Sequence, residues 1–380
     1  MKRKEFLRTS LAAAAAGLLG PAASACRGGG KSRLASASGR TAMTVKLYDL
    51  KLRHAWGLSR GTWTVRRNAF VRIERDGTTG FGEAAPIARY EESAEQAAAF
   101  IEQARPVLER DLWAYAERWS ELEALGPGRH AAKAALDMAV LDWVGKKLGV
   151  PVWRLFGLDK GRTLPTTYSI GIDQIEVMQA KVLEAADFDC YKVKVGTKDD
   201  RGIIEGIRKV TAKPLRVDAN EGWKSKEEAL EMIDWMAGLG VEVVEQPLAA
   251  ADLEGHGWLK ERSQLPIFAD ESLMQASDIP RIAPYFDGIN IKLMKCGGLQ
   301  EAVRMAAVAR SFGLKLMIGC MIESSLGISA AAALTPLFDY ADLDGNLLVE
   351  NDPFSGVKIK KGRLVLKDGP GLGTDAGLWK

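Results

Sequence analysis

The first third of the chain changes from strand-like to helical patterns of hydrophobic positions. Residues 45–56 and 69–84 alternate as strands do, and Asp76-Gly77 marks a hairpin turn between them. Three helical patterns follow, at residues 93–108, 112–125 and 130–148. Residues 44–160 are therefore expected to form an α+β unit with its strands first and its helices second.

After residue 160, short apolar runs alternate with amphipathic helical stretches. The runs span residues 165–170, 190–195, 215–218, 241–245, 267–270, 289–293 and 314–318. Repeated strand–helix units predict parallel strands with helical crossovers, and this many runs in one sheet favour an α/β barrel. An eighth strand is expected at residues 342–344, after a helix at residues 327–337.

The N-terminal segment has the order of an export signal. Residues 1–8 are basic, 11–20 are apolar, and 22–25 are small and precede Cys26. The start is similar to a twin-arginine signal in which one arginine is a lysine, and Cys26 resembles a lipoprotein cysteine. We expect an exported protein, either periplasmic after cleavage of residues 1–25 or membrane-anchored through a lipid on Cys26. Residues 26–43 are expected to be a flexible tether.

Removing the leader changes the net charge. The chain has 52 Lys and Arg against 49 Asp and Glu, and the leader holds four of the basic residues and one acidic residue. The remainder therefore has 48 of each and no net charge with histidine neutral. Nucleic acid is not indicated as a partner, and contact with a membrane is expected only through a lipid on Cys26.

Charged residues end the predicted barrel strands at regular intervals. They are Lys194, Asp218, Glu245, Asp270 and Lys292, each one strand–helix unit from the next. The carboxyl ends of barrel strands meet at one face, so two lysines and three carboxylates are expected at one mouth. Three adjacent carboxylates need a cation, and an all-oxygen set suits Mg²⁺ or Mn²⁺ better than zinc.

The lysines have the arrangement of an acid–base pair. Lys192 and Lys194 are expected on one strand face, where a like charge and partial desolvation would lower the pKa of one of them. Lys292 comes from a strand several positions around the barrel and would approach a substrate from the opposite side. Two bases on opposite faces of one carbon can invert its configuration.

Five segments together resemble the enolase superfamily, and its muconate-lactonising subgroup in particular: YKVKVG, RVDANEGW, VEQPL, ADES and NIKLMKCGG. The resemblance covers residues 44 to about 365. It implies a (β/α)7β modified TIM barrel at residues 161–345 and an N-terminal α+β capping domain at residues 44–160. Residues 346–380 would return to complete the capping domain.

The resemblance also implies roles for the charged residues. Asp218, Glu245 and Asp270 would bind Mg²⁺, Lys194 and Lys292 would be the acid and base, and Lys192 would tune Lys194. Enzymes of this superfamily combine a Lys or His base with Mg²⁺ that stabilises an enediolate.

Later segments resemble dipeptide epimerases within that superfamily. Asp342 and Asp344 would lie on one face of the eighth strand, remote from the metal, where two carboxylates suit a substrate ammonium group. The segment 319–327 resembles the loop that holds the substrate backbone, which assigns Glu323 and Ser324 to substrate binding.

The loop at residues 53–67 should close over the mouth and select the side chain. It carries Arg53, Arg60, Arg66 and Arg67. An arginine such as Arg53 would pair with a glutamate side chain and favour L-Ala-D/L-Glu as the substrate.

The leading hypothesis is a Mg²⁺-dependent isomerase that epimerises the Cα of the C-terminal residue of a cell-wall dipeptide. An N-acylamino acid racemase or an o-succinylbenzoate synthase is the alternative within the superfamily. A tethered protein that binds peptides without turnover is the alternative from another class, and the two opposed lysines speak against it. Such barrels often form symmetric assemblies, so a homo-oligomer stays open.

Overall fold

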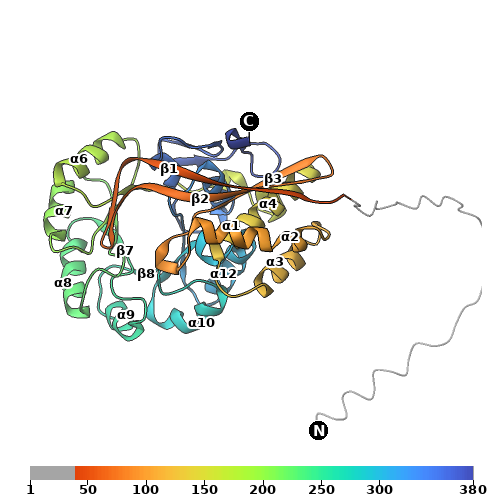
Figure 1. Cartoon of the computed structure of the whole chain (residues 1–380). Helices are drawn as coiled ribbons and strands as arrows, with labels where there is room; N and C mark the ends of the chain where they lie inside the picture. Colours follow the sequence, from red (N-terminus) through yellow and green to blue (C-terminus); the bar gives the residue numbers. More distant parts are fainter. Residues whose placement is uncertain (1–38, 380) are drawn as a thin grey trace, which may run out of the picture. The chain divides into compact units, whose positions relative to one another are not determined.

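The computed structural model of the chain describes residues 39–379. The predicted signal segment, Cys26 and the tether as far as residue 38 lie outside the described residues. The described part begins with a three-stranded antiparallel sheet and continues through helices into an eight-stranded parallel sheet (Figure 1). Within this part, no helix combines the length and the apolarity needed to cross a bilayer.

The antiparallel sheet contains two hairpins where the sequence predicted one. Its strands, in order, are β1 (Ala42–Leu58), β2 (Gly61–Arg75) and β3 (Thr78–Ala84). Asp76 and Gly77 have φ angles of 51° and 69°, as a tight hairpin turn requires, but this turn joins β2 to β3. The run at residues 69–84 is therefore two strands, because alternation continues on both sides of the turn. A second hairpin at Ser59-Arg60 joins β1 to β2.

The N-terminal α+β unit at residues 44–160 is called the first unit below, and its helices cover this sheet. They are α1 (Ala94–Gln103), α2 (Arg105–Leu108), α3 (Tyr115–Ala124) and α4 (His130–Leu148), followed by α5 (Val152–Leu155). The helix predicted at residues 93–108 is divided in two near Pro106, which has no N–H for the helical ladder. The structure confirms the bounds predicted for α4, which ends at Gly149 with a left-handed φ of 68°.

Helix α4 lies between the antiparallel sheet and the barrel. It contacts β3 on one side and α11 (Leu293–Cys296) and α12 (Leu299–Ser311) on the other. The approach to β3 is very close, since a Cβ on Gly82 would lie 1.8 Å from the carbonyl oxygen of Ala135. A Cβ on Gly80 would lie 2.0 Å from the carbonyl oxygen of Ala139. Glycine is needed here for space rather than for an unusual φ.

The parallel sheet is the predicted (β/α)7β barrel. Its strands are β4 (Tyr168–Ile170), β5 (Tyr191–Lys194), β6 (Leu215–Asp218), β7 (Val241–Glu245), β8 (Ile267–Ala269), β9 (Gly288–Lys292), β10 (Lys315–Gly319) and β11 (Tyr340–Asp342). They pair in sequence order, and a parallel bridge joins Thr166, two residues before β4, to Ala341 of β11. The element directly after β11 is a short 3-10 turn, Gly345–Leu348, in place of a crossover helix.

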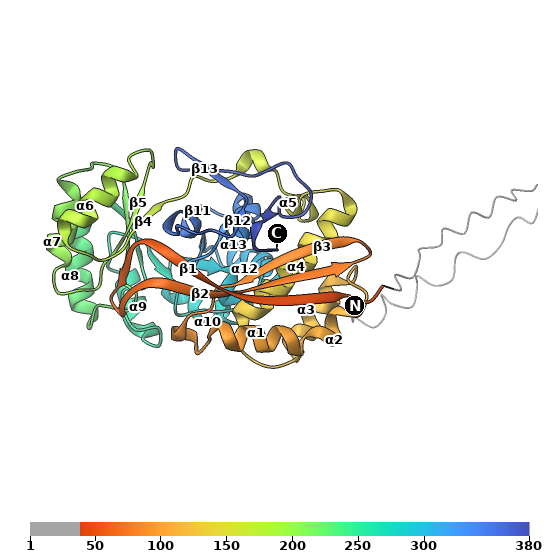
Figure 2. The ribbon, with the colours of Figure 1, turned by 45° about the horizontal axis from the view of Figure 1, so that its top comes forward.

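Helical crossovers join the barrel strands. They are α6 (Ile175–Glu184), α7 (Asp200–Arg208), α8 (Lys226–Ala237), α9 (Leu253–Lys260), α10 (Ile279–Ile282), α11 with α12, and α13 (Ser325–Ala333). Figures 1 and 2 show the long β1–β2 hairpin running from the side of α1–α4 toward α7–α9, so that its turn reaches the barrel.

The C-terminal segment packs back on the first sheet. It contains β12 (Phe354–Ser355) paired with β15 (Asp375–Ala376), and β13 (Lys358–Lys360) paired with β14 (Arg363–Val365). The ring of Phe354 stacks on Phe70 of β2 at 5.5 Å, and Trp379 lies 5.4 Å from Phe81 of β3. The first and last parts of the described chain thus form one unit.

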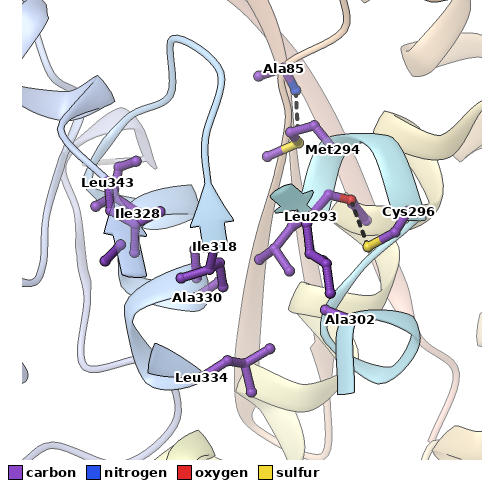
Figure 3. Packing of buried hydrophobic residues seen from close by; sticks show 14 of the residues in the cluster. Ala85, Leu293, Met294, Cys296, Ala302, Ile318, Ile328, Ala330, Leu334 and Leu343 are labelled. Carbon is purple, nitrogen blue, oxygen red and sulfur yellow. Dashed lines mark hydrogen bonds between the residues drawn. The ribbon is translucent and has the colours of Figure 1, made fainter. Parts of the chain in front are cut away.

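A continuous apolar core joins this unit to the barrel. Figure 3 shows Leu293, Met294 and Cys296 of α11 packed beside strand β10 and helix α13. Ala85, directly after β3, donates its backbone N–H to the sulfur of Met294 at 3.3 Å (Figure 3). The docking of the first unit on the barrel is therefore part of the core and not a surface contact.

We predict that Gly82→Ala destabilises the protein. The added methyl group would overlap the backbone of α4, so the free energy of unfolding should fall by about 1–3 kcal/mol in urea denaturation. Gly238→Ala is the control, because its Cβ would meet its nearest neighbour, the carbonyl oxygen of Trp235, at an ordinary 3.5 Å. Equal stability of the two variants would contradict the close packing of β3 on α4.

Candidate active site

Three carboxylates meet at the carboxyl ends of neighbouring barrel strands. Asp218 ends β6, Glu245 ends β7 and Asp270 directly follows β8. All three are buried, and each can offer an oxygen within 4.8 Å of the others. Hard divalent cations such as Mg²⁺ prefer oxygen ligands of this kind, so these residues fit a magnesium site.

Lysines contact each of these carboxylates. Lys194 Nζ lies 2.6 Å from Asp218, and Lys292 Nζ lies 2.8 Å from Asp270. Lys192 Nζ lies 2.8 Å from Glu245 and 3.2 Å from Asp218. The structure thus brings together all six metal and lysine residues that the sequence predicted.

Lys194 and Lys292 approach one cavity from opposite sides. Lys194 comes from β5 and Lys292 from β9, and three strands separate these in the eight-stranded order. Strands four steps apart in a closed eight-stranded barrel face each other across it. Both lysines line the same cavity beneath the β1–β2 hairpin. A carbon atom held between them would have an amine on each face.

The carboxylates keep two of the lysines charged. Burial lowers the pKa of Lys192, but Asp342, Glu245 and Asp218 outweigh it and raise this pKa well above its ordinary value. Burial and repulsion by Lys192 lower the pKa of Lys292, but Asp270, Glu245 and Asp218 together outweigh them and raise it. A lowered pKa at either of these lysines is therefore not found. Lys192 is a fixed cation, and Asp218 joins it to Lys194 because both amines contact this carboxylate.

The three carboxyl groups differ in the direction in which their pKa values are shifted. Burial opposes ionisation of Asp218, but Lys194 and Lys192 lower its pKa. Lys292 and Lys295 lower the pKa of Asp270 in the same way. The pKa of Glu245 is raised, first by burial and then by repulsion from Asp218. The lysines therefore leave some repulsion among the three carboxylates, and a bound divalent cation would remove this repulsion.

Asp342 belongs to the same charge network as the metal-site carboxylates and the lysines. The sequence had led us to expect it remote from the metal, and this prediction is wrong. Its Oδ2 lies 2.7 Å from Lys192 Nζ, which joins it to Glu245. Burial alone would raise the pKa of Asp342, but Lys192 holds it at about 2. No pattern in the sequence indicated this network. It extends to Thr167, whose hydroxyl group donates to Asp342 at 2.6 Å.

Asp344 lies beside Asp342 but has no lysine partner among the described residues. It accepts hydrogen bonds from Ser169, at 2.6 Å from the backbone N–H and 3.2 Å from the hydroxyl group. Burial and repulsion from Asp342 raise its pKa to about 7. Ser169 Oγ also lies 3.4 Å from Asp342, so both carboxylates contact the same hydroxyl group. The strand expected at residues 342–344 is in fact Tyr340–Asp342, so Asp344 lies two residues beyond it.

The loop after β10 is held by a buried glutamate that the sequence analysis missed. Glu83 of β3 accepts hydrogen bonds from the backbone and hydroxyl groups of Ser324, at 2.9 and 2.5 Å. It also accepts from Gly327 at 3.0 Å and from Asn68 at 2.8 Å. These hydrogen bonds from Ser324 to Glu83 therefore hold the loop after β10 against the first unit.

Glu323 lies in the same loop and points one carboxylate oxygen to the backbone N–H of Met321, at 2.7 Å. Its other oxygen is buried and has no hydrogen-bond partner among residues 39–379. Burial, followed by repulsion from Glu83, raises the pKa of Glu323 to about 8. Met321 and Ile322, which directly precede Glu323, line the cavity.

The turn of the β1–β2 hairpin covers the barrel mouth, as predicted for this loop. Arg60 at the turn donates to the carbonyl oxygen of Asn220 at 3.0 Å and to Glu271 at 3.0 Å. Glu221 receives two hydrogen bonds from Arg89, at 2.8 and 2.9 Å. These contacts join parts of the chain far apart in sequence, and no spacing signals them.

Arg53 lies outside the cavity that the lysines line. Its Nε donates to the carbonyl oxygen of Leu347 at 3.0 Å, and the side chain borders a neighbouring small hollow with His54 and Tyr168. Arg60 and Arg66, by contrast, line the main cavity together with Trp56, Tyr90 and Asn68. Lys194 Nζ lies 5.9 Å from the centre of the Trp56 ring, which caps this side of the site.

Comparison with known proteins gives two family matches. Residues 40–157 match the mandelate racemase / muconate lactonizing enzyme N-terminal domain, and residues 176–376 match an enolase C-terminal domain-like family. An L-Ala-D/L-Glu epimerase of Bacteroides thetaiotaomicron is 42% identical over 337 residues, 88% of each chain. A hydrophobic dipeptide epimerase of a Flavobacteria bacterium is 38% identical over 346 residues, 87% of this chain and 97% of that one.

A solved structure matches over the same part of the chain. It is the dipeptide epimerase of Enterococcus faecalis in complex with Mg and the dipeptide L-Leu-L-Tyr. The TM-score is 0.84 at 32% identity, with 89% of this chain and 99% of that one covered.

We predict that Mg²⁺ stabilises the protein through the three carboxylates. At a Mg²⁺ concentration 100 times Kd, binding should add about 2.7 kcal/mol and raise Tm in a thermal melt. Glu245→Gln should remove most of this shift. Glu242→Gln is the matched control, because Glu242 lies on the same strand but is exposed. A full Mg²⁺ shift in Glu245→Gln would contradict the assignment.

Proposed function

Because the chain belongs to the mandelate racemase / muconate lactonizing enzyme family of the enolase superfamily, we propose that it is a Mg²⁺-dependent dipeptide epimerase. It would invert the Cα of the C-terminal residue of a dipeptide. The observation that carries the proposal is the placement of Lys194 and Lys292 on opposite sides of one cavity, beside a buried carboxylate triad. An acid–base pair of this kind serves removal of a proton on one face and its return on the other.

Different residues of the chain would bind the metal and transfer the proton in this reaction. Asp218, Glu245 and Asp270 would hold Mg²⁺, which supplies positive charge where a substrate carboxylate becomes an enediolate. Lys194 and Lys292 exchange the Cα proton. Lys192, kept cationic by its carboxylate partners, contacts Asp218 and Glu245 at 3.2 and 2.8 Å and holds these two metal-site carboxylates together.

A free substrate ammonium group has a binding site at the other end of the cavity. Asp342 and Asp344 both line it, and Asp344 has spare acceptor capacity because only Ser169 bonds to it among the described residues. An N-acylated amino acid offers no ammonium group to these carboxylates. The buried pair therefore favours a dipeptide over the substrate of an acylamino acid racemase.

We predict that each lysine serves one epimer. In D₂O with Mg²⁺, the wild-type protein should interconvert the two epimers of a dipeptide and place deuterium at the C-terminal Cα. Lys194→Gln and Lys292→Gln should each slow interconversion by about 10²–10⁴-fold. Each variant should still exchange the Cα proton of the one epimer that its remaining lysine faces, and the two variants should differ in which epimer this is.

Lys198→Gln is the control for these variants, because Lys198 is an exposed residue shortly after β5. Mass spectrometry and chiral chromatography would follow exchange and inversion separately. Exchange of the same epimer by both lysine variants would contradict opposed bases. Absence of Cα exchange by the wild-type protein with every dipeptide of a library would refute the proposed activity.

We also propose that the protein is exported and acts on dipeptides released from the cell wall. The order of basic, apolar and small residues before Cys26 supports this. We predict that the full chain appears in the membrane fraction and that Cys26→Ser moves it to the soluble periplasmic fraction. A chain without residues 1–25 should stay in the cytoplasm. Equal fractionation of all three chains would contradict export through this leader.

A further inference from the structure

Asp270 is the metal-site carboxylate that has a different lysine on each of its two oxygens. Lys292 Nζ donates to its Oδ2 at 2.8 Å, and Lys295 Nζ lies 2.5 Å from its Oδ1. Both lysines are buried, one at the end of β9 and the other in helix α11. Lys292 lines the cavity, whereas Lys295 lies behind its wall. The two oxygens of Asp270 therefore differ: Oδ2 is on the side of the cavity, and Oδ1 is covered by the protein.

Further contacts hold Lys295 in this position. Its Nζ also donates to the backbone carbonyl oxygens of Asp270 and Leu273, at 2.5 and 3.3 Å. All of these acceptors belong to the short segment that follows β8, and the lysine side chain is 1% exposed. Moving this amine away from Oδ1 would break several buried polar contacts at once, which is costly. Lys295 is thus a static partner of Asp270, and Lys292 is the one on the side of the reaction.

The other two metal-site carboxylates also have one oxygen each that a neutral donor holds. Asp218 Oδ1 accepts the backbone N–H of Asn220 at 3.0 Å, and Glu245 Oε1 accepts the side-chain amide of Asn290 at 2.9 Å. The protein thus leaves one oxygen of each carboxyl group to a cation. Asp270 differs from its two neighbours because the group on its second oxygen is itself a cation.

We propose that Lys295 is a positioning residue that restricts Asp270 to one metal-binding oxygen and thereby favours Mg²⁺ over Ca²⁺. Mg²⁺ requires a nearly ideal octahedron, whereas Ca²⁺ takes more oxygens and accepts a carboxylate through both of them. An ammonium group 2.5 Å from Oδ1 excludes a second cation from that oxygen by contact and by repulsion. The inference rests on the magnesium site of the proposed function and adds to it the residue that selects the ion.

The test measures binding of the two ions alone, without a substrate. Free Mn²⁺ has a sharp EPR signal that is lost on binding, so displacement of bound Mn²⁺ by Mg²⁺ and by Ca²⁺ gives the ratio of their Kd values. Loss of a positive charge near the site changes the affinity for both divalent ions alike, and this effect cancels in the ratio. Lys295→Met should shift the ratio by about 10–100-fold in favour of Ca²⁺, the size expected when a group that orients a metal ligand is lost.

Lys133→Met is the matched control for this variant. Lys133 is as deeply buried as Lys295, with 1% side-chain exposure, but it pairs with Glu123 at 3.1 Å and donates to the carbonyl oxygen of Gly126. Both variants replace a buried ammonium group by a thioether of similar length. Lys133→Met should therefore keep the wild-type ratio of the two Kd values, whatever it does to the free energy of unfolding.

The outcomes separate this inference from the metal site beneath it. A wild type that binds no Mg²⁺, or a Glu245→Gln variant that binds it equally well, would overturn the magnesium site and with it the proposed function. A wild type that binds Mg²⁺ while Lys295→Met keeps its ratio would overturn the role of Lys295 alone.

A second measurement needs no variant and so does not depend on how well Lys295→Met folds. In a crystal structure of the wild type with Ca²⁺, Asp270 should bind the ion through one oxygen, with Lys295 still on Oδ1. Binding of Ca²⁺ through both oxygens of Asp270, with Lys295 displaced, would overturn the inference.

Discussion

The burial of many like charges at one barrel mouth is the constraint on which this structure depends. Asp218, Glu245 and Asp270 lie together out of water, and a protein accepts this only where cations compensate. Lys192, Lys194 and Lys292 provide part of that compensation. A barrel can supply it because adjacent strands deliver one side chain each to the same point. The same contacts hold the lysines where acid–base chemistry needs them.

The first unit completes this site by closing it. Its hairpin turn reaches the barrel loops through Arg60, and Glu83 holds the segment after β10 by three hydrogen bonds from Ser324 and Gly327. Helix α4 and the glycines of β3 fix how closely this unit docks. Water exclusion strengthens each charge interaction beneath the hairpin. The cover of the cavity and the chemistry thus come from different parts of the chain, joined by a shared core.

Periodic features of the site were predictable from sequence, and contacts between distant segments were not. The five charged residues from Lys194 to Lys292 could be placed because each lies one strand–helix unit after the one before. Parallel strands bring residues with this spacing together at one end of the barrel. The salt bridge from Lys192 to Asp342 spans 150 residues and follows no repeat. Arg53 and Arg66 look alike in sequence, and only the path of the hairpin decides which one lines the cavity. Glu83 likewise shows no signal, since its role depends on how two units dock.

The most direct test is a crystal structure of the protein with Mg²⁺ and a bound dipeptide. We expect the ion on Asp218, Glu245 and Asp270, with Lys194 and Lys292 on opposite faces of the C-terminal Cα. We also expect the substrate ammonium group at Asp342 and Asp344. An ion bound elsewhere, or both lysines on one face of that carbon, would rule out proton transfer between two opposed lysines beside a magnesium ion.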